Sequence, residues 1–446
     1  MYVADSRSTP ATPAPAARST RSGRRAAVAP TVLALGTVSL ITDVSSEMVT
    51  AVLPLYLVAG LGLSPLGFGL LDGVYNGFSA LVRLVGGHLA DRGGRHKTVA
   101  VLGYGLSALC KPLLLVAGSL PLIGAVLAAD RTGKGLRTAP RDALISLASP
   151  AESRGRAFGV HRAMDTAGAL IGPLVAFLIL RQAVDGYDAV FTVSFCVAAV
   201  GVLVLVLFVP SRRQQPATAP AGDPAAPAGA PRASLKAALA LLKVEEVRRL
   251  AFCALLLGLT TVSDSFVYLL LQRRLGVPDQ WFALLPLGTA AAFLLLAVPL
   301  GRLADRVGSR RVFLGGHVAL LLAYVTLLSG WQGTALPYLV LALHGGFYAA
   351  TDGVLMAATA GCVPAELRSS GLALVQTGQA LARFGCSIAF GAAWSAWGDR
   401  TALGTATATL AVCAGVAFAL LPASSGTPSK NPGELTEPKE PGEGPA

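Results

Sequence analysis

The chain has 446 residues, of which 53% are hydrophobic and 13% are charged, and its mean hydropathy is +0.62. Soluble proteins carry about 25% charged residues, so this composition excludes an ordinary soluble domain and predicts an integral membrane protein. The formal net charge of +12 could indicate nucleic acid, but the basic residues fall mainly in alternate loops, as membrane topology requires, and no nucleic-acid partner is expected.

The apolar stretches recur along most of the chain. Residues 1–26 and 422–446 are rich in Ala, Pro, Ser, Gly and Glu and predict disordered tails. Between them we count about 12 stretches near the roughly 20 residues that a bilayer crossing needs. Both termini then lie on one side of the lipid bilayer, and the basic loops predict that this side is cytoplasmic. We expect a multi-pass protein of the inner or plasma membrane.

The first apolar stretch contains two acidic residues. Asp43 and Glu47 stand four residues apart in "TDVSSEM" (42–48), so they share one helix face. Ionisable residues inside a membrane are functional candidates by default, because burying them in lipid is costly. These two are candidates for proton coupling, and structural ion pairing is the alternative.

The fourth stretch contains the most polar segment, "DRTGKGLRTAPRD" (130–142). On an α-helix its charged residues fall within an arc of about 120°, so they share one face. An Arg or Lys at the bilayer centre costs roughly 2.5–3.5 kcal/mol, so this face must look inward, onto a cavity or onto acidic partners. The candidates for substrate binding, or for balancing buried acids, are Arg131, Lys134, Arg137 and Arg141.

The fifth stretch pairs another two ionisable residues. His161 and Asp165 are four residues apart, and a histidine titrates near neutral pH, so this pair is a second candidate for proton coupling. Small residues follow on the same helix, where they permit close helix packing, and a proline can bend it. They are Gly159, Gly168, Gly172 and Pro173.

The chain divides into two related halves. "GGHLADRGGRHK" (86–97) matches "LGRLADRVGSRR" (300–311), and "PAESR" (150–154) matches "PAELR" (364–368), both at an offset of 214 residues. We predict six helices in 27–210, a cytoplasmic linker with an amphipathic helix in 211–247, and six helices in 248–421. Most of the ionisable residues inside the predicted helices fall in the first half. The second half has Asp264, His344, Asp352 and Arg383.

The repeated loop resembles the signature G-x-x-x-D-R/K-x-G-R-R/K of the major facilitator superfamily. The resemblance covers 30–421 and implies two six-helix bundles, related by pseudo-two-fold symmetry, that rock about a central site. It also implies that the two loops gate the cytoplasmic side. The residues concerned are Gly87, Asp91, Arg92, Gly94 and Arg95, and, in the second copy, Gly301, Asp305, Arg306, Gly308 and Arg310.

Two further features resemble exporters of that superfamily. The glycines and proline of the fifth stretch follow G-x8-G-x3-G-P, which is similar to the antiporter motif, although the family's trailing glycines are absent. Arg131, Lys134 and Gly135 are similar to R-x-x-Q-G, with Lys in place of Gln. The prediction is proton-coupled efflux of a small organic molecule by alternating access, working as a monomer.

Two alternatives stay open. One is a proton-coupled symporter or exchanger of an anionic organic solute, a phosphate or carboxylate held by the basic face of the fourth helix. The other is a membrane sensor. Catalytic and phosphate-binding motifs are missing and the six cysteines stand singly, so we expect neither an enzyme, nor a cofactor, nor a metal site.

Overall fold

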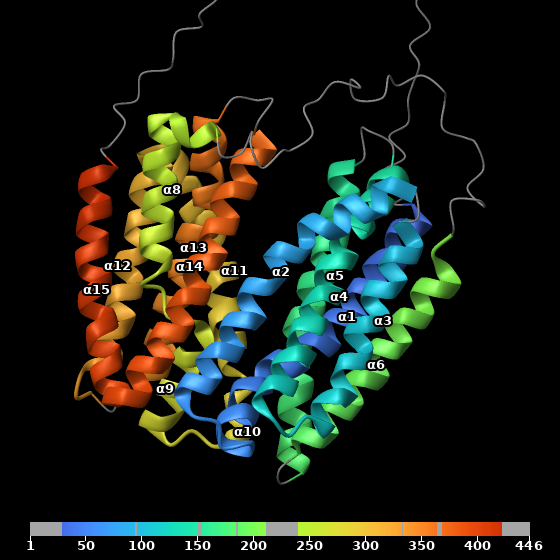
Figure 1. Ribbon diagram of the computed structural model, residues 1–446, viewed down its shortest axis with the longest axis horizontal. Helices are drawn as coiled ribbons and strands as arrows, with labels where there is room; N and C mark the ends of the chain where they lie inside the picture. The colour runs from blue at the N-terminus through green and yellow to red at the C-terminus, as the bar shows by residue number, and fades with distance from the viewer. Residues whose placement is uncertain are drawn as a thin grey trace, which may run out of the picture.

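The computed structural model describes residues 29–93, 96–149, 154–183, 186–210, 240–331, 333–363 and 368–421, and every regular element in these ranges is a helix (Figure 1). The predicted tails lie outside them, as do 211–239 of the linker. The all-helical membrane class predicted from the sequence is confirmed.

The first half of the chain forms one bundle of antiparallel helices. Pro54 near the end of the first helix has no amide N–H to donate, and the helix continues beyond it as a short π-helical turn. The helices are α1 (Pro30–Leu55) with η1 (Tyr56–Gly60), α2 (Pro65–Gly93), α3 (His96–Val116), α4 (Leu120–Leu147), α5 (Arg154–Gln182) and α6 (Tyr187–Phe208).

The second half forms a second bundle, whose first crossing is broken. A 3-10 turn at Leu241–Lys243 and then helix α8 occupy part of the segment predicted to be an amphipathic linker helix, so this bundle begins slightly earlier than expected. The helices are α8 (Glu245–Gly258), α9 (Asp264–Leu275), α10 (Asp279–Phe282), α11 (Leu285–Val307), α12 (Ser309–Leu328), α13 (Leu336–Cys362), α14 (Arg368–Trp397) and α15 (Asp399–Leu420).

Eight helical segments of the described chain are long and apolar enough to cross a membrane. Helices α2, α4 and α14 have 29, 28 and 30 residues, long enough to cross a bilayer, but they carry more polar side chains. Helices α8 and α9 together form one further crossing, which a break at 259–263 divides. The eight apolar segments, helices α2, α4 and α14, and the α8–α9 pair make up the expected twelve crossings.

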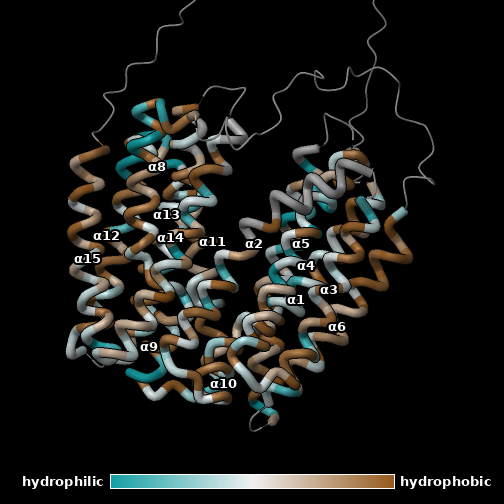
Figure 2. The backbone as a smooth tube through the Cα atoms, in the orientation of Figure 1, coloured by the Kyte–Doolittle hydropathy of each residue, from teal (hydrophilic) through white to brown (hydrophobic). Residues whose placement is uncertain are grey.

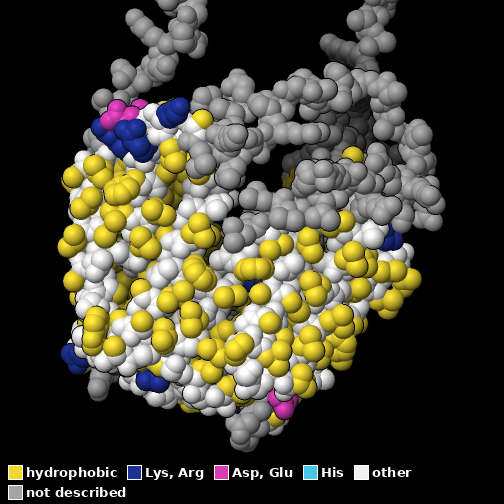
Figure 3. Space-filling model, in the orientation of Figure 1, with side chains coloured by type: hydrophobic (Ala, Val, Ile, Leu, Met, Phe, Trp, Pro, Cys, Tyr) yellow, Lys and Arg dark blue, Asp and Glu magenta, His cyan; other side chains and the backbone are white. Residues whose placement is uncertain are grey.

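The outer surface matches a lipid environment. Helices α6 and α15, at the two outer edges, are hydrophobic along most of their length (Figure 2). In the face shown in Figure 3, hydrophobic side chains cover the middle, and most of the charged ones lie toward the ends of the helices. Leu203, Leu207 and Phe418 are more than half exposed, as expected for residues that contact lipid tails.

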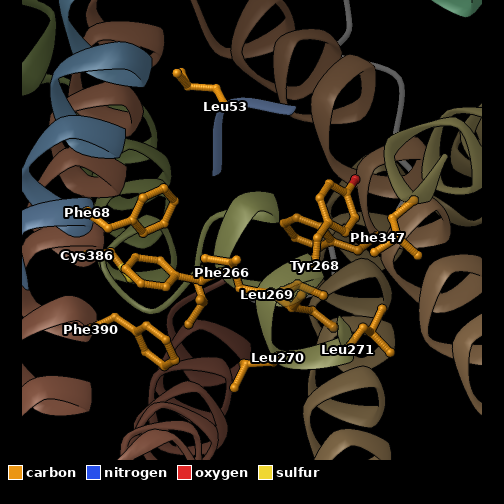
Figure 4. Close-up of a cluster of buried hydrophobic side chains, with 14 of the residues drawn as sticks. Leu53, Phe68, Phe266, Tyr268, Leu269, Leu270, Leu271, Phe347, Cys386 and Phe390 are labelled. Carbon is orange, nitrogen blue, oxygen red and sulfur yellow. The ribbon is translucent and has the colours of Figure 1, made fainter. Parts of the chain in front are cut away.

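The two bundles meet at one end of the molecule. We call the side where α6 ends and α8 begins the linker side, and the opposite side the far side. The ring of Phe266 on α9 packs edge-on against Phe68 of α2 and Phe390 of α14, each with centroids 4.9 Å apart (Figure 4). Phe177 and Trp281 make a second contact between the bundles, at 5.1 Å. These apolar contacts close the space between the bundles on the far side.

Candidate functional site

A cavity of about 810 Å³ lies between the two bundles. Helices α1 and α2 form its wall on one side, and α9, α11, α13, α14 and the break at 259–263 form it on the other. Its volume falls within the roughly 300–1,000 Å³ of small-molecule sites. Charged residues in the wall are Glu47, Asp264, Asp352 and Arg383, and tyrosines are Tyr75, Tyr268 and Tyr348.

The charged face of α4 points into the first bundle, where each basic residue has an acidic partner. Arg131 is 6% exposed; its Nη2 lies 2.5 Å from Asp130 Oδ2, and its guanidinium lies 3.8 Å from the centre of the Tyr75 ring. Asp130 also accepts a 2.5 Å hydrogen bond from Ser107 Oγ on α3. This arrangement satisfies Arg131 without a ligand.

The next two basic residues of α4 reach α1. Arg137 Nη2 lies 3.4 Å from Asp43 Oδ1, and its guanidinium lies over the Tyr104 ring at 4.4 Å. Lys134 Nζ lies 4.0 Å from Glu47 Oε1. Both side chains of the Lys134–Glu47 pair are about one-third exposed, whereas the side chain of Arg137 is 4% exposed. Of the two acidic residues on α1, only Glu47 lines the cavity.

The last basic residue of α4, Arg141, forms an ion pair with α5. Arg141 lies 3.6 Å from Asp165 and 3.0 Å from Asp142, and it donates a hydrogen bond to Ser39 Oγ. Ser39 Oγ is 2.9 Å from His161 Nε2, so both members of the predicted His161–Asp165 pair belong to this cluster. Neither of them lines the cavity.

The second bundle has its own ionisable cluster, for which the sequence predicted no role. Asp264 begins α9, and its Oδ1 accepts hydrogen bonds from Tyr348 Oη at 2.5 Å and from His344 Nε2 at 3.0 Å. Arg383 Nη2 lies 3.8 Å from Asp352 Oδ1, and its guanidinium lies 5.5 Å from the Tyr348 ring centre. This cluster faces the cavity across from Glu47.

The sequence signal that could have identified this cluster is the polar run "TTVSDS" (260–265) within an otherwise apolar stretch. Thr260 and Thr261 both donate hydroxyl hydrogen bonds to the Leu257 carbonyl at 2.9 Å, and the Val262 amide donates to Tyr324 Oη at 2.8 Å. These hydrogen bonds satisfy the Val262 amide and two hydroxyls where the backbone leaves the helix, and α9 starts at the depth of the cavity.

A polar contact also joins the bundles. Asp72 of α2 is 5% exposed and accepts a 2.7 Å hydrogen bond from Ser387 Oγ of α14. Asn76, one turn later, donates to the Asp72 side chain at 3.2 Å. Since α2 and α14 belong to different halves, the hydrogen bond between Asp72 and Ser387 must break when the bundles separate there.

Two of the three glycines singled out on α5 lie against α1. A Cβ atom at Gly168 would come within 2.4 Å of the Leu40 carbonyl oxygen, and one at Gly172 within 2.7 Å of that of Val44. Within the described chain, a Cβ atom at Gly159 would meet no atom of another helix or side chain within 4 Å, so the packing argument does not extend to it. Pro173 is buried within α5.

Of the two predicted gating loops, the structure describes the first in part and the second in full. Gly94 and Arg95 lie outside the described residues, and Gly87, Asp91 and Arg92 lie in the last turns of α2. In the second copy, Gly301, Asp305 and Arg306 are in the last turns of α11, and Gly308 joins α11 to α12 with a φ of 97°, which favours glycine. Arg310 Nη2 lies 4.0 Å from Glu246 at the start of α8.

Comparisons with known proteins agree with this architecture. A family model described as Major Facilitator Superfamily matches residues 35–384 and 282–443. An uncharacterized MFS-type transporter of Methanocaldococcus jannaschii is 27% identical over 382 residues, 83% of this chain and 90% of that protein. An uncharacterized protein of Mycobacterium tuberculosis is 38% identical over 156 residues, 35% of this chain and 38% of that protein.

Solved structures show the same fold. The nucleoside transporter NupG aligns with a TM-score of 0.73 at 14% identity, over 87% of this chain and 98% of that chain. A bacterial homologue of the lysosomal transporter Spinster, in an inward-facing and unoccupied conformation, aligns with a TM-score of 0.70 at 17% identity, over 87% and 96%. At these identities the likeness shows the fold alone.

Proposed function

The chain belongs to the Major Facilitator Superfamily, and from that premise we propose that it exports a small organic molecule in exchange for protons. Membership makes it a multi-pass secondary transporter of the membrane and not an enzyme. The proposal concerns the finer points: the coupling ion, the direction, and a plasma-membrane location with both termini in the cytoplasm.

The observation that carries the proposal is the position of Glu47. Of the four residues predicted to couple protons, it is the one in the cavity wall, and its only ion-pair partner in the described chain is Lys134 at 4.0 Å. A carboxylate in that position can exchange protons with cavity water and interact with a substrate. Asp43, His161 and Asp165 are held in the cluster around α4 and support the bundle instead.

The direction of transport rests on α5. The segment similar to the antiporter motif places Gly168 and Gly172 at the contact with α1, the helix that carries Glu47. Close packing of these two helices couples any movement of α5 to the wall of the cavity. The direction itself is supported by the likeness of this segment to the antiporter motif of exporters, in which a proton enters as the molecule leaves.

The alternative, a symporter or exchanger of an anionic solute bound by the basic face of α4, has less support. Arg131, Arg137 and Arg141 each lie 3.6 Å or less from a carboxylate oxygen within the first bundle. An anionic substrate would have to displace these partners, at the cost of leaving carboxylates buried without a counter-charge. None of the four basic residues of this face lines the cavity.

The test begins with a growth-inhibition panel in a bacterial host that lacks its own exporters. Any compound to which the chain confers resistance is then added to energised everted vesicles, and proton release is recorded with a pH-sensitive dye. We expect Glu47→Gln to abolish compound-driven proton release, while Glu245→Gln, a matched change at an exposed residue that pairs with Arg249, leaves it unchanged.

Two outcomes would contradict the proposal. Proton release at the wild-type level in Glu47→Gln would show that Glu47 does not couple proton movement to transport. Resistance without any compound-driven proton movement would show that the chain does not exchange the compound for protons.

A further inference from the structure

The walls of the cavity carry more acid than base. Three carboxylates, those of Glu47, Asp264 and Asp352, line it together with one guanidinium, that of Arg383. Lys134 lies behind Glu47 at 4.0 Å, and Arg383 lies 3.8 Å from Asp352. Lys134 therefore pairs with Glu47 and Arg383 pairs with Asp352, and Asp264 is the third carboxylate of the wall.

Asp264 has hydrogen-bond donors but no Lys or Arg ion-pair partner among the described residues. Within the described residues, no Lys or Arg nitrogen lies within 4.0 Å of it, and its partners are His344 and Tyr348. The His344 ring is fully buried, and its Nδ1 has no hydrogen-bond partner in the described chain. Nε2 of this ring and the Tyr348 hydroxyl both approach Asp264, and neither belongs to a Lys or Arg.

The local structure stabilises a negative charge at Asp264 without cancelling it. The residue opens α9, where the amide groups of the first turn favour an anion. Both described hydrogen bonds to Asp264 converge on Oδ1. The side chain is 39% exposed in a protein where the side chains of Arg137 and Asp43 are 4% and 14% exposed. An acceptor is therefore available on the cavity side.

The rest of the wall suits an organic body and not a bare metal ion. The cavity is about 810 Å³, and Tyr268, Phe293, Pro286 and Val262 line it near α9 and α11. In the described residues there is no group of three or more His, Cys, Asp or Glu side chains that could hold a metal. Aromatic faces also attract organic cations.

Resting on the proposed function, we propose that the transported molecule is an organic monocation with an aromatic or apolar body, and that Asp264 binds its positive charge. Arg383 is matched by Asp352, so a carboxylate on the ligand would compete with that pair. A monocation suits the cavity, because Asp264 is the carboxylate of its wall that has no Lys or Arg partner among the described residues.

The test uses two ions of the same shape and opposite charge. Binding of tetraphenylphosphonium and of tetraphenylborate is measured at equilibrium, with the purified full-length chain in lipid nanodiscs and no proton gradient. We expect saturable binding of the phosphonium, which tetraphenylborate does not compete for. Asp264→Asn should weaken phosphonium binding at least tenfold, and Asp264→Glu should restore most of it.

The control is Asp279→Asn, the same chemical change at an exposed residue of α10 that bonds to Gln272, and it should bind normally. Equal affinity for both ions, no saturable phosphonium binding by the wild type, or unchanged binding by Asp264→Asn would each overturn the inference. If Asp264→Asn does not fold, the two ions compared on the wild type decide the charge of the ligand, and a changed phosphonium affinity in Asp264→Glu, where the carboxylate is moved by one methylene, decides whether Asp264 binds it. The assay has no proton gradient, so its failure is distinct from a failure of proton coupling in the vesicle assay.

Discussion

Arg137 and Asp43 carry opposite charges where little water reaches, with side chains 4% and 14% exposed. Removing one member of a buried pair leaves the other charge unpaired and costs about 3–5 kcal/mol, whereas replacing both by apolar residues is often neutral. We therefore expect Arg137→Met to lower the thermal unfolding midpoint in detergent strongly, and Arg137→Met combined with Asp43→Leu to recover most of the loss.

The matched control is Arg162→Met. Arg162 has a 79% exposed side chain and a 3.8 Å ion pair with Asp165, and exposed pairs contribute about 0–1 kcal/mol. If Arg137→Met unfolds at the wild-type temperature and instead loses ligand binding, Arg137 contacts substrate and the balancing role is wrong.

The sequence could predict the residues of the α4 cluster because helical periodicity places them on one face. It also named Asp43, Glu47 and Asp165 as acidic residues within reach. It could not assign the role of Asp264, because that role depends on His344 and Tyr348 from α13, which are 80 and 84 residues away along the chain. A periodic pattern describes one helix and not which helices meet.

At the scale of elements, α1 and α5 pack with glycine at the contact. Ala at Gly168 would place Cβ 2.4 Å from a backbone oxygen of Leu40, so one helix must shift. Overpacking of this kind costs about 1–3 kcal/mol. We expect Gly168→Ala to lower the unfolding midpoint, and to lower transport further because the helix with Glu47 is displaced.

Gly159→Ala makes the same change on the same helix, at a site with no atom within 4 Å. Gly159→Ala should leave the stability of the folded protein unchanged or raise it by about 0.5–1 kcal/mol, because alanine is more stable than glycine inside a helix. Equal midpoints for the two variants would mean that α1 and α5 do not depend on this close approach.

The polar run at 260–265 marks where the break between α8 and α9 lies, but the hydropathy pattern alone does not require a break there. An unbroken helix would pair its backbone amide and carbonyl groups with one another, and the apolar pattern from 248 onward is compatible with such a helix. A broken helix needs hydrogen-bond partners from other helices for the amides at the break. Tyr324 of α12 is such a partner, because its hydroxyl accepts a hydrogen bond from the Val262 amide. Tertiary contacts thus decide the local structure here, and with it the position of Asp264.

At the scale of the molecule, the repeat at an offset of 214 residues predicted two bundles, and the structure has them. The repeat does not say on which side the bundles touch. That depends on contacts between halves, such as Phe68 with Phe266, which pair residues that no internal symmetry relates. The conformation is therefore information that only the structure adds.

The contact between α2 and α14 on the far side gives the last prediction. A Cβ atom at Gly69 would lie 2.4 Å from the Ser387 carbonyl oxygen, so valine there penalises the conformation in which these helices touch. A penalty of about 1–3 kcal/mol shifts a two-state equilibrium by roughly 5- to 150-fold toward the conformation in which they separate.

Spin labels at Leu66→Cys and Trp397→Cys report this separation, because both positions are exposed near the far-side ends of α2 and α14. On a background with the six native cysteines replaced, we expect Gly69→Val to populate longer distances. Gly105→Val, on α3 where no atom lies within 4 Å, should leave the distribution unchanged. If the Gly69→Val distribution matches the wild type, contact between α2 and α14 does not hold the far side closed, and the seal must rest on the Phe68–Phe266–Phe390 cluster.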